Sequence, residues 1–500
     1  DITATGNTAG ADGGAIYVHN PVSTTITNSR FSGNFAGADG GAIHLNNNDG
    51  VDDTQTLSSL TFTDDSAAKS GGSVWAHVEG PITMSDITAS GSNAVDEGGF
   101  AYLTSDDSSV TQAKFLIENS TFSDHRATGG SGRAGAIKVR DAYQLTVDGV
   151  SVSDSGAVTE AGGLYIESVH TTSLRHSTFA RNVAGTRTGG VAVYNVGDSV
   201  SIEASTFVGN ESTQGAAGFY VDLDANSGLI RNTTVTGNKA VGVTQPRGGG
   251  VYVGGDPGSS VLLDFVTVSG NTAYDGGGLF LYRDVAGTVI NSIVSGNQST
   301  DPGLDVLVDA NATLDDSFSL FTSADAVSGA TIDGPGSIFG APRLNGLADN
   351  GGPTLTMLPQ WDSPAFQAGD PNWQAPPATD HRGAGFPRDA GGRVSMGAIQ
   401  GRSAKPAPPP AVPASPPRDV QATAGDGEIL VSWMPPASTG TFPVTAYQVD
   451  DSTGVNSCLL NVAPGDPLSC VIEDLINGTV YSFRVRALTG AGWGAWSDFT

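Results

Sequence analysis

The sequence predicts an all-β protein with two domains, a parallel β-helix of about 10–12 coils followed by a β-sandwich. Three observations support this prediction. The 500 residues include 69 Gly and only 4 Met, a composition that speaks against long helices because Gly is costly inside them. A pattern of about 29 residues recurs as far as residue 325, and such repeats indicate stacked structural units. A proline-rich run then separates the repeats from a segment with different patterning.

The first motif of the repeat is a pair of small residues followed by an apolar anchor, as in residues 13–18. Two positions past the anchor the side chain is usually apolar again, which is typical of a half-buried strand. Successive anchors are 26 to 37 residues apart, as expected if insertions lengthen only the turns. The anchors are Ile16, Ile43, Val74, Phe100, Ile137, Leu164, Val191, Phe219, Val251 and Leu279.

The second motif lies between anchors and ends in Asn, as in residues 29–34. Its Asn members either stack as amides along the coils or act as ligand groups. One coil of short strands per period explains both motifs, with backbone hydrogen bonds running to the coils on either side. A β-propeller is the main alternative, but its blades need longer periods. The Asn members are Asn34, Asn182, Asn210, Asn238, Asn271 and Asn297.

Together, the two motifs resemble the repeats of right-handed β-helix surface proteins, including polymorphic outer-membrane proteins and autotransporter passengers. The resemblance covers residues 1 to about 325. It implies a right-handed parallel β-helix over residues 1–340 and a location outside the cell or on the surface of a bacterium.

After the repeats, residues 341–401 carry an ordered series of Gly, Pro and charged motifs, including Asp380, His381 and Arg382. This series resembles the terminal region of bacterial choice-of-anchor β-helix surface proteins. We expect the segment to cap the β-helix, because an open sheet edge would pair with another chain. Catalysis by Asp380, His381 and Arg382 is the alternative interpretation.

Residues 402–417 are rich in Pro and predict an extended, semi-rigid linker. In residues 418–500, the positions of Trp433 and of Leu475, Gly478 and Tyr481 resemble a fibronectin type III sandwich with a tyrosine corner. We expect this domain to be truncated at Thr500. Its two cysteines, Cys458 and Cys470, suggest one disulfide formed in an oxidising compartment; a pair of free thiols is the alternative.

The net charge of the chain argues against some classes of partner. Lys plus Arg number 23 and Asp plus Glu number 51, a net charge of −28, which argues against nucleic acid as a partner. No run of eighteen apolar residues occurs, so we predict no membrane-spanning segment in this chain. We expect both ends to be cut from something longer.

Calcium is the one cofactor that the sequence suggests. Asp222, Asp224 and Asn226 place oxygen ligands at alternate positions, partly like a calcium loop. The loop's usual Gly and its downstream bidentate Glu are missing. A second acidic turn contains Asp49, Asp52 and Asp53, and a solvated turn is the alternative at both places.

Three functions remain. The first is a non-enzymatic structural or adhesion protein at the cell surface, a stiff rod that self-assembles or binds cell-surface glycans or proteins. The second is a polysaccharide lyase or hydrolase, although we find no catalytic constellation and the histidines are scattered. The third is a glycan-binding module. Its candidate aromatic residues are Tyr17, Trp75, Tyr165, Tyr252 and Phe280.

Overall fold

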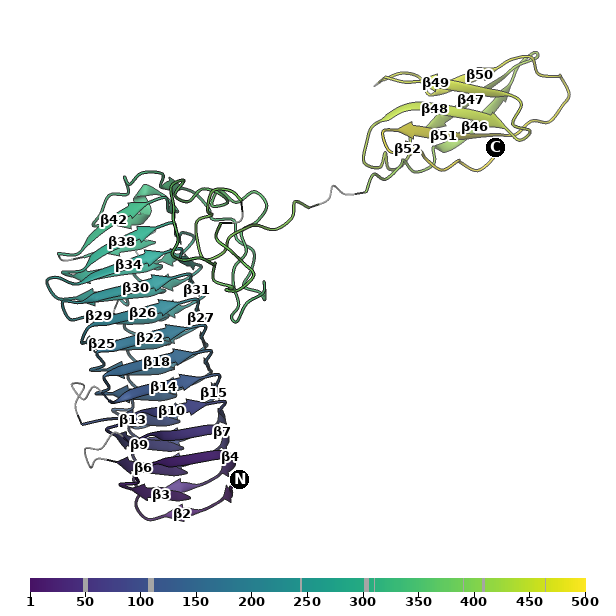
Figure 1. Ribbon diagram of the computed structural model, residues 1–500. Helices are drawn as coiled ribbons and strands as arrows, with labels where there is room; N and C mark the ends of the chain where they lie inside the picture. The colour runs from purple at the N-terminus through teal and green to yellow at the C-terminus, as the bar shows by residue number, and fades with distance from the viewer. Residues whose placement is uncertain are drawn as a thin grey trace. The chain divides into compact units, whose positions relative to one another are not determined.

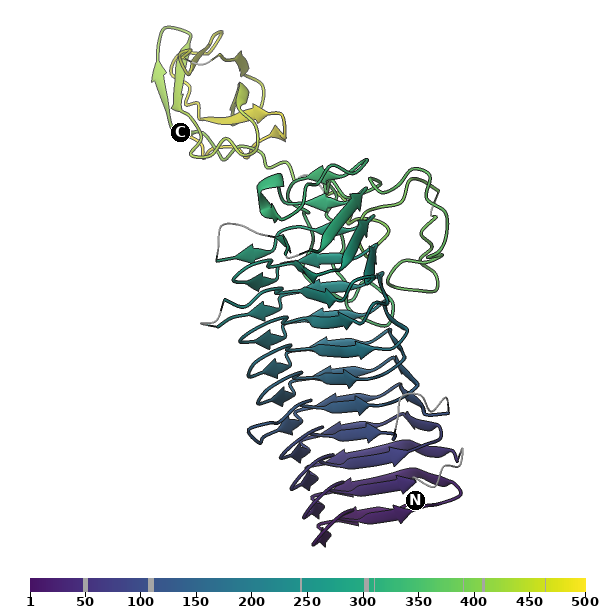
Figure 2. The ribbon, with the colours of Figure 1, turned by 90° about the vertical axis from the view of Figure 1, so that its left-hand side faces the viewer.

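The computed structural model describes residues 1–47, 53–106, 112–242, 245–300, 305–309, 311–389, 391–406, 410–463 and 465–500. The chain divides into two compact units, Asp1–Lys405 and Pro406–Thr500. The first is a parallel β-solenoid of about 11 turns, whose coils stack along one axis (Figures 1 and 2). In the described ranges the one helical element is a 3₁₀ turn at Ala324–Ala326. The predicted all-β class and the β-helix are confirmed.

The anchor motif forms one sheet of the solenoid, here called the anchor sheet. Its 12 strands pair in parallel, each with the corresponding strand of the neighbouring coils. The strands are β3 (Ile16–His19), β6 (Ile43–Asn47), β9 (Val74–Val78), β13 (Ala101–Thr104), β17 (Ile137–Arg140), β21 (Leu164–Glu167), β25 (Val191–Val196), β29 (Phe219–Leu223), β33 (Val251–Gly255), β37 (Leu279–Arg283), β41 (Val306–Val308) and β44 (Val327–Ser328).

The second motif lies in a sheet of 22 strands, the wide sheet, to which most coils contribute two strands. The strands are β1 (Thr3–Thr5), β4 (Thr24–Ser32), β7 (Gln55–Thr63), β10 (Ile82–Ser85), β11 (Thr88–Ser90), β14 (Lys114–Glu118), β15 (Thr121–Ser123), β18 (Gln144–Asp148), β19 (Ser151–Ser153), β22 (Thr171–Arg175), β23 (Thr178–Ala180), β26 (Ser199–Glu203), β27 (Thr206–Val208), β30 (Ser227–Arg231), β31 (Thr234–Thr236), β34 (Ser260–Asp264), β35 (Thr267–Ser269), β38 (Ala286–Ile290), β39 (Ile293–Val294), β42 (Thr313–Ser317), β43 (Leu320–Phe321) and β45 (Ile338–Phe339).

A narrow sheet of two-residue strands closes each coil. Its 11 strands are β2 (Thr8–Ala9), β5 (Phe35–Ala36), β8 (Ser66–Ala67), β12 (Asn93–Ala94), β16 (Arg126–Ala127), β20 (Gly156–Ala157), β24 (Val183–Ala184), β28 (Glu211–Ser212), β32 (Lys239–Ala240), β36 (Thr272–Ala273) and β40 (Gln298–Ser299).

Most anchors follow a pair of glycines, which are needed where neighbouring coils approach closely. Gly40 has a φ of +68°, a left-handed conformation that L side chains rarely adopt. A Cβ on Gly41 would lie 1.9 Å from the carbonyl oxygen of Gly72 in the next coil. The first glycine therefore permits the turn and the second permits the stacking distance.

The anchors lie in one buried column, with one correction. In the fourth coil the residue in register is Ala101, which pairs with Val74 and Ile137; Phe100, the predicted anchor, precedes it. The Phe100 ring is nevertheless fully buried. Its centroid lies 5.3 Å from that of Phe62 and 4.8 Å from that of Phe122.

Phe100 fills a place that the second motif leaves vacant in this coil. The apolar member of that motif is Phe62 in the coil before and Phe122 in the coil after, but it is Ala89 in between. The ring that is missing at Ala89 is thus supplied from the anchor sheet. Protein interiors are closely packed, and the small Ala89 side chain would leave a cavity in the core if no other ring filled the space. This explains why Phe100 points inward in this coil.

The Asn members of the second motif form a ladder of amides inside the solenoid. The side-chain nitrogen of Asn182 donates to the Oδ1 atom of Asn210 at 3.1 Å, and the Asn210 nitrogen donates to Asn238 at 2.9 Å. The series continues through Asn271 to Asn297, again at 2.9 Å. These amides are buried between coils, so the stacked-amide prediction is confirmed.

The last coil is covered by residues 324–339, where β44 and β45 extend two of the sheets. Val327, Ala330 and Ile332 pack against the solenoid core there. This covers the apolar end of the coil stack.

Residues 341–401, here called the strap, pack along the side of the solenoid (Figure 1). The strap carries few strand pairings, and its hydrogen bonds reach four successive coils. Thr206, Asn232, Thr267 and Asn291 of the solenoid bond to Leu355, Thr379, Ala398 and Asp370 of the strap, respectively. We expected this segment to cap the end of the solenoid. It covers a flank instead, because its partners belong to the outer face of the wide sheet.

The second unit is an antiparallel β-sandwich. Its apolar side chains, including Trp433, Tyr447 and Phe483, pack between two sheets. The Tyr481 hydroxyl oxygen accepts a hydrogen bond from the Ile476 backbone at 3.1 Å, the bond expected of a tyrosine corner. The strands are β46 (Arg418–Ala424), β47 (Ile429–Met434) and β50 (Ser469–Ile472) in one sheet, and β48 (Val444–Asp451), β49 (Ser457–Asn461), β51 (Phe483–Thr489) and β52 (Gly492–Trp493) in the other.

Cys458 and Cys470 form a disulfide in the structure. Cys458 belongs to β49 and Cys470 to β50, so the bond joins the two sheets of the sandwich. In the chain-entropy account, a cross-link across twelve residues of separation stabilises a fold by restricting the unfolded chain.

Candidate functional site

The outer face of the anchor sheet carries a column of aromatic side chains, one position past each anchor. Strand pairing places these residues directly beside one another from coil to coil. Where rings are neighbours their centroids lie between 4.2 Å, for His44 and Trp75, and 6.4 Å, for Trp75 and Tyr102. This aromatic column consists of Tyr17, His44, Trp75, Tyr102, Lys138, Tyr165, Ala192, Tyr220, Tyr252, Phe280 and Leu307.

Two breaks in the column are filled from nearby. The Lys138 ammonium lies 5.5 Å from the ring centre of Tyr102 and 5.0 Å from that of Tyr165, and it pairs with Glu97 at 2.8 Å. At Ala192 the ring is missing, and Tyr194 takes its place, with its centroid 5.3 Å from Tyr165 and 4.9 Å from Tyr220. A cation–π contact therefore bridges the first break, and ring contacts of Tyr194 bridge the second.

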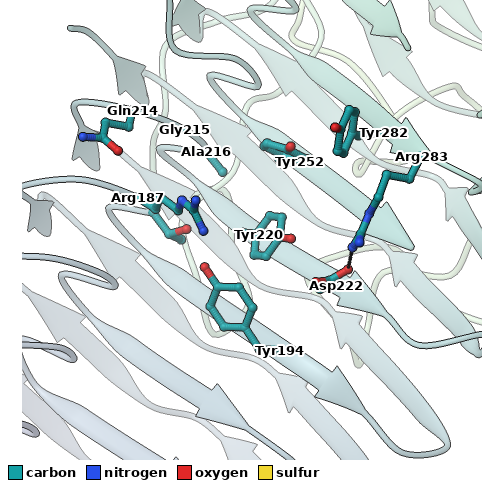
Figure 3. Close-up of a pocket in the computed structure, with 11 residues that line it drawn as sticks. Arg187, Tyr194, Gln214, Gly215, Ala216, Tyr220, Asp222, Tyr252, Tyr282 and Arg283 are labelled. Carbon is teal, nitrogen blue, oxygen red and sulfur yellow. Dashed lines mark hydrogen bonds and ion pairs between the residues drawn. The ribbon is translucent and has the colours of Figure 1, made fainter. Parts of the chain in front are cut away.

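A pocket of about 470 Å³ opens in this face at β25, β29, β33 and β37. Figure 3 shows its floor, formed by Tyr194, Tyr220, Tyr252 and Tyr282. Arg187 and Gln214 lie on one side, in the loops that lead into β25 and β29. Asp222 and Arg283 lie on the other side, at the ends of β29 and β37.

The hydroxyls of Tyr194, Tyr220 and Tyr252 stay protonated at neutral pH. Burial raises the pKa of Tyr252 to about 12. Burial also raises the pKa of Tyr194, and burial together with the Asp222 carboxylate raises that of Tyr220. Each hydroxyl can therefore both donate and accept a hydrogen bond.

The charged groups around the pocket are largely balanced. Asp222 and Arg283 form an ion pair, and the other guanidinium nitrogen of Arg283 lies 3.5 Å from Asp256. Arg187 lies 3.7 Å from Glu160. The site thus offers aromatic rings, planar hydrogen-bonding groups and little net charge, which are the features of a pocket for a polar, uncharged molecule.

Gly254 leaves room at the edge of this pocket. A Cβ added there would meet the Asp222 carboxylate at 3.4 Å, the Tyr220 hydroxyl at 3.5 Å and the Arg283 guanidinium at 3.8 Å. These are ordinary contact distances, so a side chain at this position would enter the space between the polar groups without displacing backbone.

Part of this face is predictable from the sequence, since all five predicted aromatic residues lie in the column. Tyr194 and Tyr282 were not predicted, although both stand three positions past an anchor, where strand alternation also points side chains outward. Arg187 and Gln214 come from turns of variable length, and nothing in the repeat pattern indicates that they lie beside the tyrosines.

One of the three predicted calcium ligands takes part in an ion pair. Asp222 pairs with Arg283. The Asn226 amide nitrogen donates to the backbone oxygens of Val196 and Asp224, at 2.8 and 2.6 Å. Asp224 is exposed. Calcium binding here stays a prediction. In the second acidic turn, Asp49 and Asp52 lie outside the described residues.

Among the described residues, one group of three potential metal ligands comes together. The Nε2 atom of His77 lies 2.8 Å from Asp106 and 3.6 Å from Glu79. The Glu79 carboxylate also accepts a hydrogen bond from the Asp106 backbone. The imidazole of His77 therefore lies between two carboxylates.

The Asp380, His381 and Arg382 side chains fasten the strap. Asp380 is buried and pairs with Arg382 at 2.6 Å. His381 is buried between the hydroxyls of Thr234 and Thr354, at 3.2 and 2.6 Å, and burial lowers its pKa to about 3. A neutral, enclosed imidazole of this kind fits an anchoring role better than proton transfer to a substrate.

Comparison with known proteins assigns the sandwich. The model for the fibronectin type III domain matches residues 415–500, which include the antiparallel sheets, the buried Trp433 and the tyrosine corner. Residues 415–500 form a fibronectin type III domain. The predicted sandwich is thereby confirmed.

Curated relatives match this fibronectin type III domain. Fibronectin type-III domain-containing protein 3A of Homo sapiens is 36% identical over 93 residues, covering 19% of this chain and 8% of that protein. Neogenin of Rattus norvegicus is 33% identical over 94 residues, covering 17% and 7%. The chain thus spans less than a tenth of the length of these relatives. Among solved structures, domains A168–A170 of titin share 27% identity over 18% of this chain and 31% of that chain, with a TM-score of 0.15.

The solenoid has a match of its own. The model for the Chlamydia polymorphic membrane protein repeat matches residues 28–46, which hold one second motif, the glycine pair and the anchor Ile43. The resemblance to β-helix surface proteins, joined to a fibronectin type III domain, is therefore confirmed. No helix in the described ranges has the length and apolar character to cross a membrane.

Proposed function

We propose that the chain is a non-enzymatic adhesion or structural protein on the surface of a bacterium. The observation that supports this most directly is the pairing of polymorphic-membrane-protein-type coils with a fibronectin type III domain in one chain. Coils that hydrogen-bond to both neighbours along three sheets make a stiff scaffold. On this scaffold the anchor sheet presents the pocket lined by Tyr194, Tyr220 and Tyr252 to a partner.

The disulfide agrees with this location, since such bonds persist in oxidising compartments outside the cytoplasm. The net charge of −28 favours solubility outside the cell and disfavours acidic polymers as partners. The partner class that we propose is a glycan or a protein of another surface.

Antibody labelling tests the location. An antibody raised against the full chain should label intact, unpermeabilised cells of the bacterium that produces it, and protease added outside these cells should remove the label. Labelling that requires permeabilisation would contradict the proposal.

Incubation with acidic and neutral polysaccharides tests the non-enzymatic role. The full chain should release no new reducing ends and form no unsaturated ends. Release of either at a rate that scales with protein concentration would replace the proposal with a polysaccharide lyase or hydrolase.

A further inference from the structure

We propose that the tyrosine pocket on the anchor sheet, at Tyr194, Tyr220, Tyr252 and Tyr282, binds a pyranose ring of an uncharged oligosaccharide. The inference deepens the proposed surface function and rests on it, since it names the partner class and the site.

Open space distinguishes the pocket from the rings that flank it in the aromatic column. These flanking rings are covered: Tyr165 is 3% exposed and Phe280 is 1% exposed, and Arg133 and Arg247 lie over them at 5.7 and 5.5 Å. At the pocket, four tyrosines instead line an open volume of about 470 Å³.

The composition of the pocket matches the two faces of a sugar. A pyranose presents C–H groups on its flat faces and hydroxyls around its edge. Tyrosine rings provide large, rigid apolar contact area together with a hydroxyl. The Asp222 carboxylate and the Arg283 and Arg187 guanidinium groups provide fixed acceptors and donors at the rim. A few convergent polar groups around an apolar floor orient a ligand and give specificity.

The charges around the pocket favour an uncharged sugar over an acidic one. Each arginine at the rim lies within 4 Å of a carboxylate, so neither is an open counter-ion for an acidic sugar. The chain as a whole, at −28, repels polyanions.

The aromatic column gives the oligosaccharide a direction. Neighbouring coils repeat at about 4.8 Å, and an extended oligosaccharide is long enough to pass over several of them. Tyr220, Tyr252 and Tyr282 belong to three successive coils, so a chain of sugars would run along the solenoid axis.

Calorimetric titration of the full chain with defined tetrasaccharides tests the proposal. The panel contains tetramers of glucose, mannose, galactose and N-acetylglucosamine, with tetragalacturonate as the acidic member. At least one neutral tetramer should bind. Tyr252→Ala should weaken that binding about tenfold or more, because it removes a stacking surface.

Two further variants keep the result interpretable. Gly254→Val adds a side chain whose Cβ lies at ordinary contact distances from Tyr220, Asp222 and Arg283. It should abolish binding while thermal unfolding stays close to that of the native chain. Tyr17→Ala changes a 53% exposed member of the same column outside the pocket and should leave affinity unchanged.

The proposal is overturned if no neutral tetramer binds, if only tetragalacturonate binds, or if binding survives both Tyr252→Ala and Gly254→Val. These outcomes are measured with purified protein, so they are separate from antibody labelling of cells, which alone decides whether the surface location fails.

Discussion

Asp65 places a buried carboxyl group in the amide ladder, which costs stability when that group is charged. It occupies a position of the amide ladder, where its Oδ1 atom accepts hydrogen bonds from the backbone and side chain of Asn34, both at 2.8 Å, while Ser73 donates to Oδ2 at 3.1 Å. Burial raises its pKa to about 6, against an ordinary value of 3.8. The folded state therefore holds a proton that the unfolded state has lost between these two pH values. Stability from this group is complete below pH 3.8 and declines as pH rises to about 6.

Replacement of Asp65 by Asn should raise stability at neutral pH. The amide keeps the acceptor for Asn34 and has no charge to bury, so the free energy of unfolding at about pH 7 should rise by up to about 3 kcal/mol, from two pKa units at 1.36 kcal/mol each. Near pH 3 the change should be small. Denaturant unfolding at both pH values measures this. Asp64→Asn, at the exposed neighbour, is the control. A destabilised Asp65→Asn protein at neutral pH would contradict this account.

The Phe100 ring fills the space that the small Ala89 side chain leaves in the core, and we predict that the fold depends on it. Phe100→Ala should lower the free energy of unfolding by about 3–5 kcal/mol, because it opens a cavity between Phe62 and Phe122. In the double variant Ala89→Phe, Phe100→Ala the ring returns at the usual position of the motif. Chemical denaturation of the two proteins should show that the double variant regains at least half of the loss. A Phe100→Ala loss of under about 1 kcal/mol would mean that the ring does not fill the stack.

At the scale of elements, the buried cation of Arg388 helps to hold the strap on the solenoid. Arg388 is fully buried, and its guanidinium donates to the carbonyls of Gly397 and Ala398 and, at 2.6 Å, to Asn232 of the solenoid. It also lies 3.9 Å from the ring centre of Phe265. Burial lowers its pKa to about 9, so the side chain stays charged at neutral pH and ties the strap to the wide sheet.

Arg388→Met should release the strap. The substitution leaves two buried acceptors, the Gly397 carbonyl and the Asn232 side-chain oxygen, without the donor that Arg388 supplies, while the Ala398 carbonyl keeps the backbone of His381 as a donor. We expect a loss of about 2 kcal/mol or more. Limited proteolysis followed by mass spectrometry should then show faster cleavage within residues 341–401. Arg343→Ala removes an exposed ion pair with Asp362 in the same segment and should change cleavage little. Equal cleavage of Arg388→Met and native protein would refute the anchoring role.

At the scale of the whole molecule, the features that repeat from coil to coil were predictable from the sequence. Features that depend on packing between one particular pair of coils were not. The anchor column followed from strand alternation, and nine of ten anchors lie in register. Phe100 was assigned one position early because the glycine pair was aligned without the neighbouring coil's packing. Val306, a further member of the column, was missed because Leu304 and Asp305 stand before it in place of two small residues.

The candidate site was likewise predictable only where its residues follow the repeat. Its tyrosines follow the period, and Tyr252 was named from the sequence. The arginine at the end of β37 and the loop residues Arg187 and Gln214 converge only because the coils stack in one particular register. The strap's position on the flank depends on side-chain hydrogen bonds between residues more than a hundred positions apart, which no local pattern encodes.

Every ladder and the proposed site depend on each period being one turn of a single solenoid. Disulfide cross-linking of outward-facing positions in the wide sheet tests this directly. Thr146 and Ser173 are neighbours in adjacent coils, and Ser201 lies one coil further. At about 4.8 Å per coil, adjacent positions fall within the Cα separation that a disulfide spans, and positions two coils apart do not. Thr146→Cys with Ser173→Cys should cross-link under mild oxidation, and Thr146→Cys with Ser201→Cys should not; cross-linking of the second pair without the first would contradict the stacked-coil structure.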